Sequence, residues 1–182
     1  GNLRSIVNAY LVRRDIENLK IVLRAKFTGD EIAERLIVPA GNFSKQYFHS
    51  LLQKESVEDV ARLVTITNLK KGIEHYQKTG SLFEIENQLD SHYYLSLLEL
   101  TTRMPKQGTV FREFIKTELD VHNVMTILRL TKEGFAAEKI EPYLFSKGSR
   151  LRKAQLQRLL VSSDVEEILE KLKSMGFRSM VG

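Results

Sequence analysis

A ten-residue pattern occurs twice in this chain, and the duplication constrains the fold more than any other feature. Residues 15–24 read DIENLKIVLR and residues 120–129 read DVHNVMTILR. Both copies fit the pattern D-x-x-N-(L/V)-x-x-(V/I)-L-R, and the same separation of 105 residues aligns Gly29 with Gly134. Self-similarity at a fixed period is typical of a supersecondary unit that is repeated. We therefore expect two copies of one structural unit.

The similarity between the copies resumes further along the chain, where the separation drifts to 107 and then 108 residues. The pairs that match there are Gly41 with Gly148, Leu51-Leu52 with Leu159-Leu160, and Val57-Glu58 with Val165-Glu166. Surface loops tolerate a drift of one or two residues. Each copy is predicted to hold a long helix, a short helix and two further helices. Residues 66–105 are predicted to form two additional helices that join the copies.

Helical periodicity runs through the whole chain. Apolar residues recur at intervals of three and four, as at Val12, Ile16, Leu19 and Leu23, which is the spacing of an amphipathic helix. Only three prolines interrupt the sequence, and no segment alternates between apolar and polar residues over the length of a strand. The expected fold class is all-α, part of a funnel-like helical repeat protein.

Capping residues, glycines and prolines set the expected limits of the helices. The expected helices span residues 4–27, 30–36, 44–53, 56–64, 67–80, 82–103, 109–133, 136–141, 150–161 and 164–175. We expect a first repeat unit over residues 1–65, linking helices over residues 66–105, and a second repeat unit over residues 106–182.

Composition excludes several classes of protein. The chain has no cysteine, which removes disulfides, thiolate chemistry and cysteine-based metal sites. No apolar run approaches the ~20 residues that cross a bilayer, and no secretory leader pattern is present, so we expect a cytoplasmic protein. The chain begins with Gly1-Asn2 rather than methionine and enters a helical pattern almost at once. We therefore expect a fragment of a longer protein.

No motif of a catalytic site occurs in the sequence. The phosphate-binding loop G-x-x-x-x-G-K-(S/T), the dinucleotide fingerprint G-x-G-x-x-G and the nucleophile elbow G-x-S-x-G are all absent. Four histidines, at positions 49, 75, 92 and 122, lie far apart and lack the spacing of zinc ligands. We expect no catalytic residue, no metal site and no cofactor.

The repeated motif places a carboxylate on an apolar helix face. At 100° per residue Asp15 falls within the apolar stripe and Asn18 at its edge, and the second copy repeats this with Asp120 and Asn123. Such a carboxylate is costly to bury unless it is paired or hydrogen-bonded. It could anchor a helix junction, by bonding a neighbouring helix N-terminus or an arginine, or act as a general acid or proton relay. Duplication favours the anchor, because an active site rarely occurs twice in one chain. The full set of motif residues is Asp15, Asn18, Arg24, Asp120, Asn123 and Arg129.

Residues 147–158, the basic segment, form the one dense cluster of like charge, with five basic residues and no acid. These residues are Lys147, Arg150, Arg152, Lys153 and Arg158. They could be a solvated helix start, a docking patch for an acidic protein surface or lipid head groups, or a phosphate contact for nucleic acid. Tyrosines such as Tyr93 and Tyr94 could stack on single-stranded nucleic acid, although aromatics at helical spacing more often pack between helices.

The repeated motif resembles a known family. Arg14-Asp15-x-x-Asn18-Leu19-x-x-x-Leu23-Arg24-Ala25-Lys26-x-x-Gly29 is similar to the signature segment of the C subunit of A-type and V-type ATP synthases, which is the d subunit in vacuolar ATPases. Glu118-Leu119-Asp120-x-x-Asn123 resembles the next repeat of that family, and residues 85–97 resemble the linking helix before it. The family has three similar helical units arranged as a funnel. The resemblance therefore covers nearly all of this chain but only about the middle of the family's length.

The resemblance implies a non-catalytic subunit of the central stalk. Such a subunit lies at the cytoplasmic face of the membrane on the proteolipid ring and receives the D and F shaft subunits. It couples proton or sodium ion transport to ATP synthesis or hydrolysis, and it has no transmembrane segment. The alternative function is a basic all-helical protein that binds nucleic acid or serves as a scaffold, as the positive charge and the tyrosines suggest.

Overall fold

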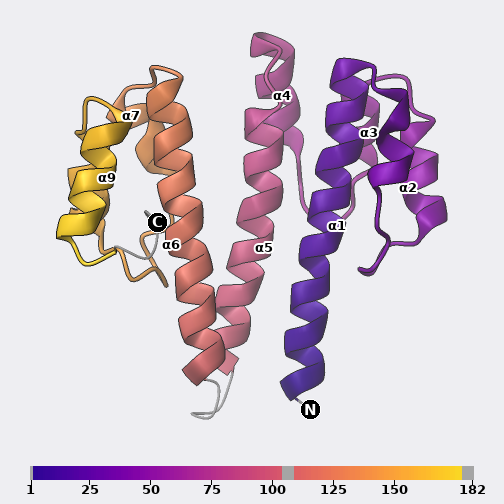
Figure 1. The fold of residues 1–182 in the computed structure, drawn as a ribbon. Coiled ribbons are helices and arrows are strands. Elements are labelled where there is room, and N and C mark those ends of the chain that lie inside the picture. The colour runs from indigo at the N-terminus through magenta and orange to yellow at the C-terminus, as the bar shows by residue number, and fades with distance from the viewer. Residues whose placement is uncertain (1, 104–108, 178–182) are drawn as a thin grey trace. The chain divides into compact units, whose positions relative to one another are not determined.

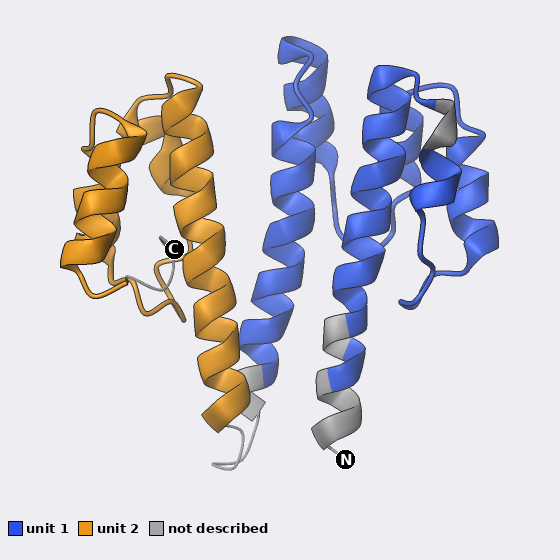
Figure 2. Cartoon of the chain, viewed as in Figure 1, with its two compact units in different colours: residues 1–103 blue, residues 104–182 orange. Residues whose placement is uncertain are grey.

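The computed structural model describes residues 2–103 and 109–177, and within these ranges it contains helices and connecting loops but no strand (Figure 1). The predicted all-α fold class is confirmed. The chain forms two compact units, residues 1–103 and residues 104–182 (Figure 2). Each of them contains one copy of the repeated motif, and the finer division at residues 65 and 105 stays a prediction.

The first unit is organised around one long helix. Its elements are α1 (Asn2–Thr28), the 3₁₀ helix η1 (Glu31–Leu36), α2 (Lys45–Leu52), α3 (Val57–Leu63), α4 (Lys70–Thr79) and α5 (Phe83–Arg103). Helix α1 packs against η1, α2 and α3 and also against α5, while α4 packs along α5 (Figure 1). Helices α4 and α5 lie in the stretch predicted to link the copies.

Local sequence signals explain the helix ends of the first unit. The hydroxyls of Ser44 and Ser56 each accept a hydrogen bond from the backbone N–H three residues on, which begins α2 and α3. Gly80 ends α4 in the left-handed region, at φ 70°, where a residue with a side chain is disfavoured. Gly72 allows the close approach of α4 and α5, because a Cβ there would lie 2.8 Å from the Ile85 Cα.

Apolar side chains of α1 and of the helices packed against it form the core of the first unit. Its largest fully buried members are Leu19, Leu23, Phe48, Leu51, Ile85, Leu89 and Leu97. They come from α1, α2 and α5, so the core joins the repeated elements to the linking helix. Burial of such side chains is the main stabilising contribution to a fold of this kind.

The second unit repeats the arrangement of α1, η1, α2 and α3. Its elements are α6 (Thr109–Lys132), α7 (Ala137–Ile140), the 3₁₀ helix η3 (Glu141–Tyr143), α8 (Lys153–Leu160) and α9 (Val165–Ser174). Helix α6 packs against α7, α8 and α9, and α8 packs against α9. The core residues Ile115, Leu119, Ile127, Leu130, Ile140, Leu159, Ile168 and Leu172 are all essentially inaccessible.

Two predicted helix starts are wrong by three residues. Helix α4 begins at Lys70 rather than Thr67, because the side chain of Asn68 accepts the Lys70 N–H and forms a turn before the helix. Helix α8 begins at Lys153 rather than at residue 150. The N–H groups of Arg150 and Leu151 donate to the Asp120 carboxylate instead, which holds these residues outside the helix.

Helix α9 carries an acid whose ionisation stabilises the fold. Hydrogen bonds from Lys171 and from Ser163 lower the pKa of Glu167 from 4.5 to about 2. A carboxyl with a depressed pKa contributes stability above its unfolded pKa and loses it as the pH falls through the folded value. We expect Glu167→Gln to lower the urea midpoint of unfolding near neutral pH. The difference from wild type should shrink as the pH falls from 4.5 toward about 2, and a constant difference would contradict this assignment.

No helix among residues 2–103 and 109–177 has the length and the apolar character that a membrane crossing requires.

Candidate functional site

The first anchor, Asp15 and Asn18 of α1, fixes the loop between η1 and α2. Asp15 is fully buried, and its Oδ2 and Oδ1 accept the N–H groups of Asn42 at 2.7 Å and Phe43 at 3.2 Å. Asn18 binds Val38 through two bonds, since its Nδ2 donates to the Val38 carbonyl at 2.9 Å and its Oδ1 accepts the Val38 N–H at 3.1 Å. The buried polar groups of this anchor are thereby satisfied by loop backbone.

Glycine 41 is required by the closeness of this contact. A Cβ on Gly41 would lie 2.1 Å from Oδ1 and 2.3 Å from Cγ of Asp15. Its φ is not in the left-handed region, so the constraint is steric rather than conformational. The glycine lets the backbone of the loop approach the carboxylate closely enough to donate the two N–H groups.

The second anchor, Asp120 and Asn123 of α6, fixes the loop between η3 and α8 in a similar way, except that Oδ1 of Asp120 alone accepts the hydrogen bonds and its Oδ2 accepts none from the described residues. Both side chains are fully buried. Asp120 Oδ1 accepts the N–H groups of Arg150 at 2.9 Å and Leu151 at 3.0 Å and also the Ser149 hydroxyl. Asn123 exchanges two hydrogen bonds with the Phe145 backbone, at 2.9 and 2.8 Å. The two copies of the motif therefore perform the same structural task in their respective units.

Both anchors present their carboxylates to loop N–H groups. Every hydrogen bond to Asp15 comes from backbone, and Asp120 adds one serine hydroxyl. Charge-assisted bonds of this kind hold a loop firmly against a helix. The geometry is that of a tie between a helix and a loop, which is the anchoring interpretation of the motif rather than the proton-relay interpretation.

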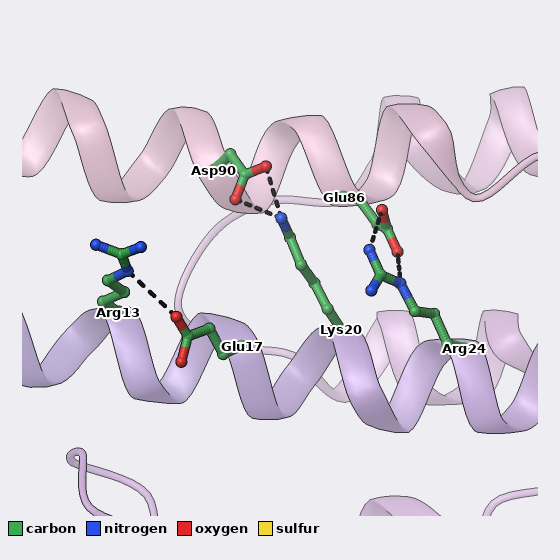
Figure 3. A network of polar contacts seen from close by, with 6 residues as sticks. All are labelled: Arg13, Glu17, Lys20, Arg24, Glu86 and Asp90. Carbon is green, nitrogen blue, oxygen red and sulfur yellow. Dashed lines mark hydrogen bonds and ion pairs between the residues drawn. The ribbon is translucent and has the colours of Figure 1, made fainter. Parts of the chain in front are cut away.

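The motif arginines point away from the anchors. Arg24 is bound by Glu86 of α5 in a bidentate pair, with Nε–Oε1 at 2.6 Å and Nη2–Oε2 at 3.0 Å (Figure 3). The hydrogen bond to Glu86 is the main cause that raises the pKa of Arg24 above its ordinary value. One turn away, Lys20 Nζ lies 2.5 and 2.6 Å from the two carboxylate oxygens of Asp90. Arg129, the equivalent residue of α6, is exposed.

The ion pairs between α1 and α5 were not predicted from the sequence, although a signal for them exists. Lys20 and Arg24 are four residues apart on α1, and Glu86 and Asp90 are four residues apart on α5. Two such pairs of opposite charge match when the helices run antiparallel, as the contacts of Arg24 with Glu86 and Lys20 with Asp90 show (Figure 3). Complementary i, i+4 pairs therefore indicate which helices lie side by side.

The basic segment lies on the loop held by the second anchor and along α8, which begins at Lys153 and has Arg158 in its last turn. All five of its basic side chains are exposed. Arg150 pairs with Glu113 at 3.1 Å and Lys153 with Glu141 at 3.8 Å. Lys147, Arg152 and Arg158 have no ion-pair partner within the described part of the chain. Three cations are therefore available to a binding partner.

The basic segment is a property of the second unit only. The corresponding residues 40–51 of the first unit contain Lys45 and His49 as their only basic side chains. The same fold is thus built there without the charge cluster. A basic residue at a helix N-terminus, such as Lys153 at the start of α8, opposes the helix dipole, so the dipole does not favour a cation at that position.

Three of the histidines and tyrosines considered as metal ligands or stacking surfaces, namely His92, His122 and Tyr93, lie against other side chains. No group of three or more His, Asp or Glu side chains within residues 2–103 and 109–177 could hold a metal ion. Burial lowers the pKa of His92, and the ring of His122 lies 5.2 Å from that of Phe145. Tyr93 is 3% exposed and packs beside Tyr94, so it cannot offer its face to a nucleic-acid base.

Comparison with known proteins agrees with the repeated motif. The family model described as ATP synthase (C/AC39) subunit matches residues 1–182. A relative from Methanocaldococcus jannaschii, named as the C subunit of an A-type ATP synthase, is 28% identical over 98% of this chain and 46% of its own length. A relative of the same name from Methanococcoides burtonii is 33% identical, over 88% of this chain and 45% of its own length. The chain therefore spans about half the length of the curated relatives it matches.

Proposed function

Because the chain belongs to the ATP synthase (C/AC39) subunit family, we propose that it is part of the central stalk of a rotary ATP synthase. In this role it joins the shaft subunits, of D and F type, to the membrane proteolipid ring at the cytoplasmic face. It transmits torque during proton or sodium ion transport and performs no catalysis itself. Rigid helical units whose loops are tied to the long helices by buried carboxylates support this mechanical role.

We further propose that the basic segment docks on the ring. The observation that carries this proposal is the group of exposed cations without an ion-pair partner in the described residues, Lys147, Arg152 and Arg158, in the second unit alone. Asp120 holds the loop that presents Lys147 and Arg150, through the N–H groups of Arg150 and Leu151. Unpaired charges on this loop and on α8 favour association with an acidic surface and steer its encounter. Family membership disfavours the nucleic-acid alternative.

Binding to purified proteolipid rings of an A-type or V-type ATP synthase tests both proposals. The wild-type chain should co-sediment with rings at low salt and more weakly at moderate salt, since screening weakens exposed charge contacts. It should not bind a random oligonucleotide. The triple variant Lys147→Glu/Arg152→Glu/Arg158→Glu should lose about tenfold or more in ring affinity.

A matched control separates a specific contact from the effect of net charge. Lys45, Lys71 and Lys78 are exposed lysines of the first unit, and Lys45→Glu/Lys71→Glu/Lys78→Glu changes the net charge by the same amount. This control should bind rings nearly as well as the wild type. Equal losses in the two triple variants would contradict docking through the basic segment. Binding to the oligonucleotide but not to rings would contradict the stalk role.

A further inference from the structure

Helix α6 carries a second apolar stripe on the side opposite to its core face. The buried residues Ile115, Leu119 and Leu130 face α7, α8 and α9. Four large apolar residues, the outer stripe, are instead exposed: Val110 84%, Phe114 40%, Val121 45% and Met125 60%. At 100° per residue these four lie on one side of the helix. A helix that is apolar on two opposite faces is normally covered on both.

The equivalent face of α1 is covered by α5. The repeat register aligns Val121 with Ile16 and Met125 with Lys20. Ile16 is only 3% exposed, and Lys20 is bound by Asp90 of α5. The pairs Lys20–Asp90 and Arg24–Glu86 show that α5 runs antiparallel to α1 along this face (Figure 3). The first unit thus shows what covers this face in one copy of the repeat: the antiparallel helix α5.

The differences between the copies define the chemistry of the missing helix. Where α1 has Lys20 facing an aspartate, α6 has Met125, so the helix opposite needs an apolar residue at the position of Asp90. Arg129 keeps the position of Arg24, so an acid at the position of Glu86 is complementary to it. The partner is therefore an amphipathic helix with an apolar stripe. It has an acid at the position of Glu86 and, one turn further on, an apolar residue at the position of Asp90.

We propose that the outer stripe of α6 seats an antiparallel amphipathic helix equivalent to α5, supplied by polypeptide outside residues 1–182. In the relatives from M. jannaschii and M. burtonii, 46% and 45% of the length matches this chain. More than half of each relative therefore lies outside the matched part, which is ample sequence for such a helix. The proposal rests on the internal repeat and stands apart from the stalk function.

A synthetic helix based on α5 tests the proposal with the whole chain as receptor. The probe is a fluorescent peptide with the sequence of residues 83–103 and the change Asp90→Leu, which replaces the acid that would face Met125. Fluorescence anisotropy should show binding to the wild-type chain. The variant Val121→Glu/Met125→Glu should bind the probe about tenfold or more weakly, since each change places a charge in the apolar contact.

Two comparisons make the result specific to the outer stripe. Leu36 and Val161 are 56% and 72% exposed and lie outside it, so Leu36→Glu/Val161→Glu should bind the probe as the wild type does. Arg129→Glu should weaken binding, and a probe with the further change Glu86→Arg should restore it. Equal binding by both double variants would overturn the proposal. Sedimentation gives a second result that would overturn it. If Val121→Glu/Met125→Glu abolishes self-association of the chain and leaves probe binding unchanged, the outer stripe binds a second copy of the chain instead.

Discussion

Replacing Asp15 with alanine should destabilise the first unit by about 3 kcal/mol. The change removes both acceptors of the Asn42 and Phe43 N–H groups, and each lost bond to a charged group costs about 1.5–3 kcal/mol. Urea unfolding gives the free energy of unfolding. Amide hydrogen exchange should show faster exchange at Asn42 and Phe43, with little change in the second unit.

An exposed acid of the same unit provides the control for Asp15. Glu55 is exposed, so Glu55→Ala should change the free energy of unfolding by less than about 0.5 kcal/mol. If Asp15→Ala lowers the free energy of unfolding by no more than Glu55→Ala does, the carboxylate does not hold the loop, and the anchoring role of the motif is wrong.

Placing a methyl group on Gly41 should be nearly as damaging as removing Asp15. The new Cβ would lie 2.1 Å from Oδ1 of Asp15, so the loop must move away and its bonds to the carboxylate lengthen or break. We expect Gly41→Ala to cost about 2–4 kcal/mol, the range of a buried steric conflict combined with lost hydrogen bonds. Urea unfolding under the same conditions measures this cost.

The double variant Asp15→Ala/Gly41→Ala distinguishes the steric explanation from a general preference for glycine. Without the carboxylate, the methyl group at position 41 has room, so the double variant should be no less stable than Asp15→Ala alone. The two single changes are then strongly non-additive, as expected for groups in direct contact. Additive losses would show that Gly41 serves the loop for a reason other than its approach to Asp15.

The helices of this fold could be predicted from sequence because their signals are local. Apolar spacing identified the long helices, and Ser56 and Gly80 set helix limits that the structure reproduces within a residue. The start of α8 could not be predicted, since it depends on a residue far away in the chain. Asp120 lies 30 residues before Arg150 and accepts a hydrogen bond from its N–H. A tertiary hydrogen bond overrode the local preference for helix.

The repeated motif identified the anchor residues but not their partners. An aspartate within an apolar stripe must be satisfied by some donor, and the sequence pointed to a helix N-terminus or an arginine. The donors are instead the N–H groups of a non-helical loop. Gly41 was a signal for the first of these loops, because a glycine after the motif allows a close approach of backbone. The donors Asn42 and Phe43 correspond to Arg150 and Leu151, so the structure matches Gly41 with Ser149 rather than with Gly148.

Photo-crosslinking would show whether the basic segment contacts the proteolipid ring, as the proposed function requires. A photoreactive residue would replace Arg152 in the basic segment or, as the control, the exposed Lys71 of the first unit. Irradiation with purified rings should attach the chain to the proteolipid from position 152 and not from position 71. Equal crosslinking from both positions, or none from position 152 while the chain co-sediments with rings, would contradict docking through this segment.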